Sequence, residues 1–342
     1  AHPRGGVLVV AGDDPNANAT VFPTDSTTAF ATWGMPVLYP GTVQEILDLG
    51  HHGYELSRAA GLWVGFKLVT TVADGSGMVS TDLGRLSFIR PTVTVAGEEF
   101  TPVLRPNNPG APMREAEKDL HDGRRRLAEK YIELNDLNPI VSGRSGARIG
   151  IVAPGKTYHD LRHALLTLGL DDERLEAAGI RVKKVLALHP IGADEWRTFA
   201  EGLETIVVVE EKRAFLESAL KSVLYDLDLR PTVLGKKDRD GAELLPMHGE
   251  FGPDLIARRL APLLLDLGLI GEDDVPRTST RSLLPVVPMD TSRGMFFCSG
   301  CPHNTSLRAP DDALVGAGIG CHILSLVVNR PEYGNQTGFT QM

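Results

Sequence analysis

The chain has little of several residue types, and each shortage excludes a class of protein. Its 342 residues carry a formal net charge of −9, so it lacks the basic excess that nucleic-acid-binding surfaces need. No apolar run approaches the roughly 20 residues that a membrane-spanning helix requires. Three cysteines are too few for a disulfide framework. Thiols in such numbers fit a reducing, cytoplasmic compartment, where they serve metals or catalysis.

What is present indicates an α/β protein. Hydrophobic residues make up 42% of the chain and charged residues 23%, which is typical of a soluble globular protein of two or three domains. Short apolar runs alternate with amphipathic segments, which predicts strands joined by helices and a parallel sheet. The predicted strands are residues 6–12, 35–39, 62–71, 148–153, 182–188 and 205–209. The predicted helices are residues 43–60, 114–134, 158–168, 195–201, 214–224 and 255–269.

All three cysteines lie between Phe296 and His322. Cys298 and Cys301 have C-x-x-C spacing, and Cys321 follows in a Gly-x-Gly-Cys turn. Two thiolates three residues apart can hold one metal centre from a single turn. Spacing alone leaves four readings open. They are zinc with His303 or His322 as fourth ligand, a [4Fe–4S] cluster lacking its fourth thiolate, a redox pair, and buried free thiols.

Polar residues at strand ends are weaker candidates for a site. Asp13 and Asp14 follow the first predicted strand and Thr71 ends the third, at the edge where open α/β sheets place ligands. The alternative is that the two aspartates form a turn or a helix cap. For Glu210 and Glu211, after the strand at 205–209, we expect a structural role as caps of the following helix.

Two basic motifs require a decision between nucleotide binding and ordinary structure. Residues 150–157 read GIVAPGKT and match the spacing of a phosphate-binding loop. The residues between the two glycines read as a strand, however, which leaves too little loop to wrap a phosphate. Residues 124–126 are three consecutive arginines in a charged helix. Contact with a phosphate or coenzyme A is one reading, and a solvated helix face is the default.

The cysteine segment resembles a known family. The runs FFCSGCPHNTS, GAGIGCH and GFTQM are similar to the thiamine-diphosphate domain of the indolepyruvate ferredoxin oxidoreductases, the large fused form within the 2-oxoacid:ferredoxin oxidoreductase superfamily. The resemblance implies that Cys298, Cys301 and Cys321 are three of the four ligands of a [4Fe–4S] cluster. It also implies contact of His303, Gly320 and His322 with the cofactor, against the alternative of hydrogen-bonded structural histidines.

The resemblance also implies a division of the chain. The expected parts are the end of a thiamine pyrimidine-binding domain (1–75), a connector with a hairpin and a charged helix (76–144), a Rossmann-like transketolase C-terminal-like domain (145–275), and a linker with the start of a thiamine-diphosphate-binding domain (276–342). The resemblance assigns no catalytic residue here, because the activating glutamate, the Gly-Asp-Gly segment for Mg²⁺ and diphosphate, and a fourth cysteine have no match. We therefore expect an internal, inactive piece of a longer protein.

The implied parent enzyme oxidises an aryl 2-oxoacid such as indolepyruvate to an acyl-CoA. Its implied cofactors are thiamine diphosphate, Mg²⁺ and a [4Fe–4S] cluster. Its implied partners are coenzyme A and ferredoxin, in a cytoplasmic homo-oligomer without nucleic acid or membrane. Two rivals are a zinc-binding structural or interaction module and a thiamine enzyme that decarboxylates without oxidation.

Overall fold

The computed structural model describes residues 2, 4–20, 22–104, 109–143, 146–228, 230–275, 294–318, 320–328 and 330–339. It divides into two compact units, Ala1–Arg277 and Thr278–Met342. The linker expected at the start of residues 276–342 falls on residues 276–293, which lie outside the described residues. In the ranges that are described, no helix is both long enough and apolar enough to cross a membrane.

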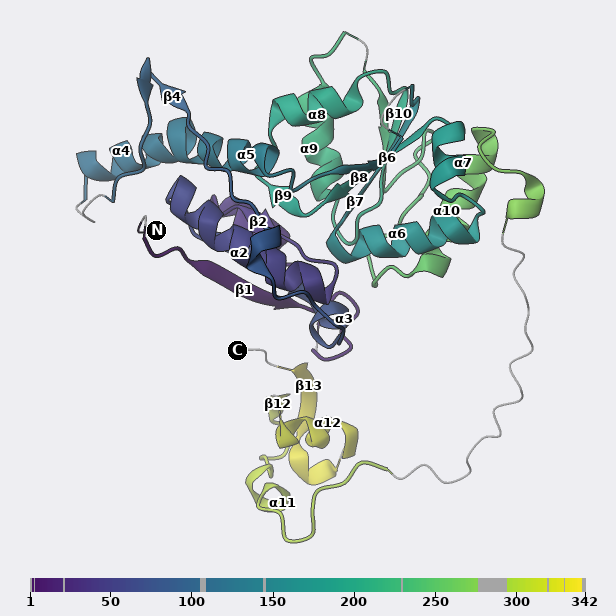
Figure 1. Ribbon diagram of the computed structural model, residues 1–342. Helices are drawn as coiled ribbons and strands as arrows, with labels where there is room; N and C mark the ends of the chain where they lie inside the picture. The colour runs from purple at the N-terminus through teal and green to yellow at the C-terminus, as the bar shows by residue number, and fades with distance from the viewer. Residues whose placement is uncertain are drawn as a thin grey trace. The chain divides into compact units, whose positions relative to one another are not determined.

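The first unit contains a four-stranded sheet in the order β1-β3-β2-β9 (Figure 1). Its strands are β1 (Leu8–Asp13), β3 (Val64–Val69), β2 (Val37–Leu38) and β9 (Ala187–His189). β1, β3 and β2 are parallel, and β9 is antiparallel to β2. α2 (Val43–Ala60) joins β2 to β3 and has the predicted bounds. It begins there because the Thr42 hydroxyl accepts a hydrogen bond from the Glu45 amide at 3.2 Å.

A second sheet in the same unit has five strands in the order β11-β10-β7-β8-β6. The strands are β11 (Thr232–Leu234), β10 (Thr205–Val208), β7 (Ile149–Pro154), β8 (Ile180–Val185) and β6 (Ile140–Ser142). All pairs are parallel except β6 with β8, so the predicted α/β class is confirmed. The helices that pack against this sheet are α6 (Gly155–Thr167), α7 (Asp172–Ala177), α8 (Ala193–Ala200), α9 (Phe215–Leu224) and α10 (Pro253–Asp266).

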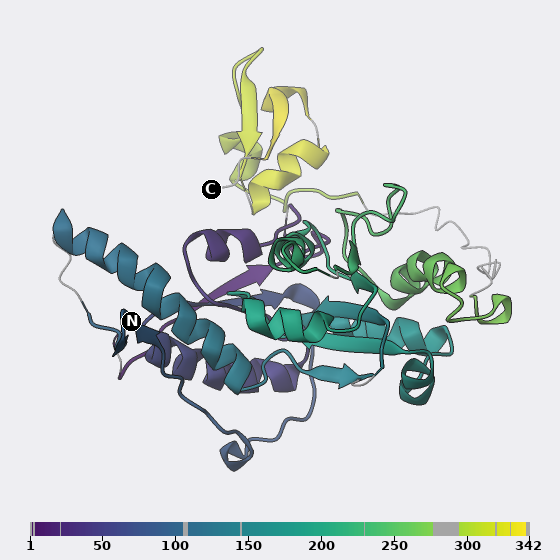
Figure 2. The ribbon, with the colours of Figure 1, turned by 90° about the horizontal axis from the view of Figure 1, so that it is seen from above.

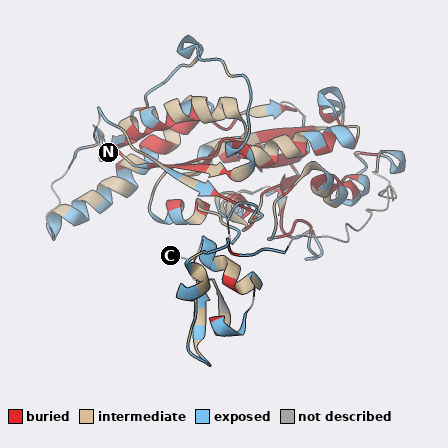
Figure 3. Ribbon diagram, turned by 90° about the horizontal axis from the view of Figure 1, so that it is seen from below, coloured by how far each residue is buried: buried red, intermediate tan, exposed pale blue. Residues whose placement is uncertain are grey.

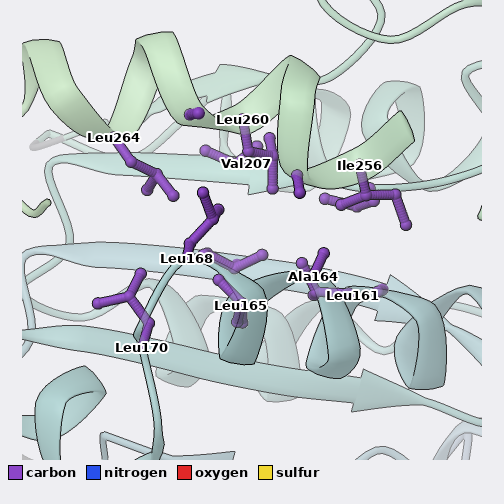
Figure 4. Close-up of a cluster of buried hydrophobic side chains, with 14 of the residues drawn as sticks. Leu161, Ala164, Leu165, Leu168, Leu170, Val207, Ile256, Leu260 and Leu264 are labelled. Carbon is purple, nitrogen blue, oxygen red and sulfur yellow. The ribbon is translucent and has the colours of Figure 1, made fainter. Parts of the chain in front are cut away.

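Both faces of the second sheet are buried, which explains its nearly continuous apolar strands. Ile151 packs with α6 and α10 on one face, and the next residue, Val152, packs with α8 and α9 on the other. Figure 4 shows Leu161 and Leu165 of α6 facing Ile256, Leu260 and Leu264 of α10 across Val207. Buried residues follow the strands and the inward faces of the helices (Figure 3).

The two sheets of the first unit share one stretch of chain. β8 ends at Val185, and β9 begins at Ala187 in the other sheet. Asn138 fixes this transition, because its side-chain oxygen accepts the amides of Leu186 and Ala187 at 3.0 and 2.9 Å. The helix α3 (Thr70–Ala73) follows β3, and α1 (Thr27–Thr32) lies between β1 and β2.

The connector contains the predicted hairpin and the predicted charged helix. β4 (Thr94–Val95) and β5 (Glu98–Glu99) pair antiparallel. The helix is α4 (Ala111–Asp119), a π-helical turn η2 (Leu120–Arg124) and α5 (Arg125–Leu134), which form one rod in Figure 2. The expectation of a solvated helix fits α4 alone, because Leu127, Ala128, Tyr131 and Ile132 of α5 are buried in the core around α2.

The second unit is small. It pairs β12 (Leu314–Ala317) with β13 (Asn335–Phe339) in parallel. Its helical turns are α11 (His303–Ser306), η4 (Cys321–Ile323), α12 (Leu324–Val328) and η5 (Pro331–Tyr333).

Candidate functional site

The three cysteines begin or end tightly bent segments of the second unit. The Cys301 amide donates to the Cys298 carbonyl at 3.0 Å, which closes the turn between them. Gly300 in that turn has a φ of +74°, a left-handed conformation that glycine adopts at little cost. Cys321 begins η4 directly after Gly320. Cys301 is half-buried, and the other two thiols are exposed.

Histidine rings connect the two cysteine segments. His303 Nδ1 lies 3.2 Å from Cys301 Sγ, and the His303 ring stacks on Phe297 with centroids 5.9 Å apart. The edge of one ring meets the face of the other between His303 and His322, with centroids 5.2 Å apart. Since His322 adjoins Cys321, a continuous path of contacts runs from the C-x-x-C turn to the third cysteine. These contacts give both histidines a packing role, and their contact with a cofactor stays a prediction.

The donor atoms of this segment fit a metal centre in kind, because thiolates and imidazoles bind zinc and thiolates bind iron–sulfur clusters. These donor atoms are farther apart than the ligands of a closed metal site. Among the residues that the structure describes, no group of three or more His, Cys, Asp or Glu side chains is gathered closely enough to hold a metal ion. The ligand set Cys298, Cys301 and Cys321 therefore stays a prediction, and we assign no chemical step to a metal here.

The loop after β1 is organised by its two aspartates. Asp14 accepts hydrogen bonds from the amides of Asn18, Ala19 and Thr20 at 2.6–2.9 Å. Burial raises the pKa of the Asp14 carboxyl, but these hydrogen bonds outweigh burial and lower the pKa to about 2. Asp13 accepts from the amide and hydroxyl of Ser26, both at 2.9 Å. Both aspartates are thus bound within the loop, as the turn alternative predicts.

A buried lysine lies beside this loop. Lys67, inside β3, donates to Asp25 Oδ1 at 2.7 Å and to Thr27 Oγ1 at 3.1 Å, and its Nζ lies 3.8 Å from Asp13 Oδ2. The ammonium also lies 4.9 Å from the centre of the Tyr39 ring. The only sequence signal for this residue is one charge inside the apolar run at residues 62–71.

The two glutamates that follow β10, Glu210 and Glu211, have different roles. Glu210 caps α9 as expected, since its carboxylate accepts the Leu216 and Glu217 amides at 2.8 and 3.1 Å. Burial raises the pKa of Glu210 to about 7, despite those hydrogen bonds. Glu211 does not cap the helix. One of its oxygens accepts the Phe251 amide at 2.7 Å, and the other has no hydrogen-bond partner.

The phosphate-loop motif is structural. Gly150 lies inside β7, and α6 begins at Gly155, so no loop remains to wrap a phosphate. Lys156 donates to the Phe251 carbonyl at 2.6 Å and pairs with Asp160 and Glu250 at 3.0 and 2.9 Å. Thr71 in turn donates to Glu250 at 2.9 Å. The lysine is therefore occupied by protein groups and is not free for a nucleotide.

A small cavity lies where these polar groups meet. Its volume is about 20 Å³, enough for about one water molecule. Asp25, Tyr39, Lys67, Thr157 and Glu211 are among its lining residues. The free Glu211 oxygen is buried there, and burial raises the pKa of this carboxyl. The cavity joins the carboxyl ends of both sheets, so residues from distant parts of the chain form one polar centre.

The arginine cluster serves the fold. Arg124 donates to the carbonyls of Gly61 and Val103 at 2.7 and 2.6 Å. Arg125 pairs with Glu129 at 3.0 Å, and Arg126 donates to the Thr94 carbonyl at 2.9 Å. Arg124 and Arg126 thus attach the helix to neighbouring segments, and Arg125 pairs within α5, which accounts for the three arginines without a phosphate.

Comparison with known proteins identifies similar sequences over almost the whole chain. Residues 139–281 match the model of the indolepyruvate oxidoreductase domain. The indolepyruvate oxidoreductase subunit IorA of Methanothermobacter marburgensis is 26% identical over 341 residues, which cover 96% of this chain and 50% of that protein. IorA of Pyrococcus abyssi is 24% identical over 333 residues, 95% of this chain and 48% of that protein. The chain thus spans about half the length of these curated relatives.

Solved structures resemble the chain more distantly. A 2-oxoglutarate:ferredoxin oxidoreductase from Magnetococcus marinus, with 2-oxoglutarate, coenzyme A and succinyl-CoA bound, gives a TM-score of 0.46 at 15% identity and covers 75% of this chain and 48% of its own. A split-gene transketolase, an inactive beta4 tetramer, gives 0.39 at 17% identity and covers 76% and 66%. At these scores neither structure places a residue or a ligand in this chain.

Proposed function

We propose that this chain belongs to the indolepyruvate oxidoreductase family and forms part of a thiamine-diphosphate-dependent oxidoreductase acting on aryl 2-oxoacids such as indolepyruvate. The observation that carries the proposal is the similarity to IorA subunits, which extends over 95 to 97% of the chain. It therefore includes both the α/β body and the cysteine segment.

The proposed reaction converts the 2-oxoacid and coenzyme A into an acyl-CoA and carbon dioxide. The bond between the carboxyl and carbonyl carbons breaks, and a thioester bond forms. Two electrons and one proton are released, and the electrons pass one at a time to ferredoxin. Thiamine diphosphate with Mg²⁺ supplies the carbanion chemistry when bound, and a [4Fe–4S] cluster supplies the one-electron outlet.

The second unit would supply the residues nearest that chemistry. Cys298, Cys301 and Cys321 are the proposed cluster ligands, and the contacts through His303 and His322 support their proximity. His303, Gly320 and His322 are the proposed cofactor contacts. Gly320 has a φ of +102° and nothing within 4 Å of the Cβ position, so its backbone is open to a bound group.

The proposed partners are the 2-oxoacid, coenzyme A and ferredoxin. We also propose that the full-length protein is a cytoplasmic homo-oligomer, on the basis of the family resemblance and the free thiols. No nucleic acid or membrane belongs to this function, in keeping with the net charge of −9.

The test uses the longer protein that contains this chain, purified without oxygen. We expect indolepyruvate and coenzyme A together to reduce methyl viologen. Cys301→Ser should abolish the reduction, because serine does not replace a cluster thiolate, whereas Ser299→Ala in the same turn should retain it. Equal activity of the two variants would contradict the proposal.

The two alternative functions predict different metal contents and different products in the same preparation. A zinc-binding structural module contains zinc without iron or acid-labile sulfide and reduces no dye. A thiamine enzyme that decarboxylates without oxidation releases carbon dioxide and an aldehyde without electron transfer. Metal analysis and product analysis therefore separate the three functions.

A further inference from the structure

A second pocket opens beside the polar cavity of the first unit. Its volume is about 510 Å³, within the usual size of a small-molecule site. It lies against the loop that follows β1 and the segment that follows β10, at the carboxyl ends of strands from both sheets. Asp25 and Arg213 line both this outer pocket and the inner cavity. Parallel α/β sheets place their ligands at this edge.

Between the two cavities, a residue with a strained backbone conformation determines where its neighbouring side chains lie. Lys212 has a φ of +57°, a left-handed conformation that costs a non-glycine residue free energy and often marks a functional site. Its buried ammonium donates to the Pro15 carbonyl, which holds the strained segment to the loop after β1. On one side of Lys212, Glu211 faces the inner cavity. On the other side, Arg213 reaches the outer pocket.

The outer pocket offers one available positive charge. Lys212 is bound to Pro15, and Asp25 is paired with Lys67. Within the described ranges, the guanidinium of Arg213 has no ion pair or hydrogen bond. A single guanidinium matches one carboxylate through two parallel hydrogen bonds. A nucleotide phosphate chain carries several charges and would leave most of them unpaired.

The pocket also exposes large apolar side chains. Trp33 is 66% exposed and Met247 is 64% exposed, and both line the pocket. An exposed indole that lines the same pocket as a guanidinium can bind a flat ring by stacking and by contact with its edge. Thr28 and Thr32 of α1 add hydroxyl groups to the wall. The lining therefore combines one anion-binding group with one aromatic platform.

We propose that this pocket is a binding site for an aromatic monocarboxylate, with the carboxylate on Arg213 and the ring on Trp33. The site goes beyond the proposed function, because it contains none of the residues assigned to the cofactor or the cluster. Binding there requires neither thiamine diphosphate nor iron. The predicted ligand class follows from one free charge, one exposed indole and a pocket of small-molecule size.

The test is calorimetric titration of the 342-residue chain with indole-3-acetate, indole and AMP. We expect indole-3-acetate to bind with a dissociation constant of about 0.1–1 mM, a reasonable affinity for a ligand of this size. Indole lacks the carboxylate and should bind at least about tenfold more weakly. AMP tests the phosphate alternative, and tighter binding of AMP than of indole-3-acetate would overturn the assignment.

Paired variants test the two contacts separately. Arg213→Gln should weaken indole-3-acetate binding about tenfold or more, whereas Arg258→Gln, on the exposed face of α10, should leave it unchanged. Trp33→Ala should weaken binding about fivefold, whereas Trp63→Ala, which is also an exposed tryptophan, should not. Unchanged thermal unfolding of each variant shows that its fold is intact.

Two results would overturn the proposal. One is the absence of saturable binding of indole-3-acetate to the intact chain, and the other is equal affinity of Arg213→Gln and the unchanged chain. Neither result bears on the proposed oxidoreductase, because the titration contains no cofactor. Conversely, a longer protein without iron would leave this binding site in place.

Discussion

The two units of the chain are built in opposite ways. The first buries a large apolar core around two sheets, in which Ile151, Leu161 and Leu165 are fully buried. In the second, within residues 294–316, 320–328 and 330–336, Phe297 and Tyr333 are the only large hydrophobic side chains that are buried. The second unit instead gathers cysteines, histidines and glycine turns.

The difference separates residues that form an apolar core from residues whose thiol and imidazole groups could bind a metal or a cofactor. A unit that buries few apolar side chains gains little stability from its own core, so a metal, a cofactor or neighbouring chain must supplement it. The first unit needs no such help. Its chemistry-bearing groups are few and lie at strand ends, where the apolar core stops.

The largest predicted effect concerns the core of the first unit. Leu165→Ala should lower its free energy of unfolding by about 4 kcal/mol, because a fully buried leucine leaves a cavity. The neighbouring Leu166 is 54% exposed, and Leu166→Ala should cost less than about 0.5 kcal/mol. Urea unfolding measures both. Equal costs would show that the burial pattern of α6 is wrong.

The second largest effect on the free energy of unfolding should come from Lys67, which lines the polar cavity between the two sheets. Lys67→Met leaves the buried carboxylate of Asp13 and the partly buried carboxylate of Asp25 without their cation, and we expect a loss of about 3 kcal/mol in the free energy of unfolding. Lys130→Met removes an exposed lysine from a surface pair and should change the free energy of unfolding by less than about 0.5 kcal/mol. If Lys67→Met were as stable as the unchanged chain, the ion pairs of Lys67 with Asp25 and Asp13 would not contribute to stability.

A smaller, pH-dependent effect should come from Glu45 of α2. Burial raises the pKa of Glu45, but hydrogen bonds from His159, Lys184 and Gly41 and the Lys184 charge lower it from 4.5 to about 2. The folded pKa is below the unfolded one, so this stabilisation is complete above pH 4.5 and is lost as the pH falls toward 2.

A shift of this size corresponds to about 3 kcal/mol, and glutamine keeps part of the hydrogen bonding, so Glu45→Gln should cost about 2 kcal/mol at neutral pH and little near the folded pKa. Denaturant unfolding at several pH values checks this difference. The matched change Glu133→Gln alters a glutamate whose side chain is 43% exposed and should leave the pH profile unchanged. Parallel pH profiles for Glu45→Gln and the unchanged chain would contradict the assignment.

The smallest effect is predicted for the turn of the second unit. Gly300→Ala forces alanine into a left-handed conformation at a cost of about 1 kcal/mol, which corresponds to about a fivefold loss of affinity for the proposed iron–sulfur cluster in the longer protein. Gly294→Ala lies outside that conformation and meets no neighbour, so it should have no effect. Competition with an iron chelator compares the two variants.

Many helices and strands of the first unit could be predicted from the sequence, because apolar periodicity and local capping residues determine where they begin and end. α2 has the predicted bounds through Thr42, and β7 and β10 are apolar runs of the expected length. β11 and β9 are only three residues long, too short for periodicity to reveal. The polar cavity was beyond prediction, because Lys67, Tyr39 and Glu211 are distant in sequence and meet only in the folded chain.

The second unit shows the reverse. Its motif residues were evident from spacing and resemblance, whereas its contacts were not. No sequence pattern predicts that His303 and His322 lie against each other, and the burial of Phe297 beside His303 is a consequence of the turns. Motifs therefore indicate chemistry in a segment whose few apolar residues leave its packing unspecified.

The most direct test of the central claim is electron paramagnetic resonance of the longer protein after reduction with dithionite. The account predicts the signal of a reduced [4Fe–4S] cluster, absent in Cys301→Ser and retained in Ser299→Ala. A spectrum without such a signal, from protein isolated without oxygen and with its thiols reduced, would contradict it.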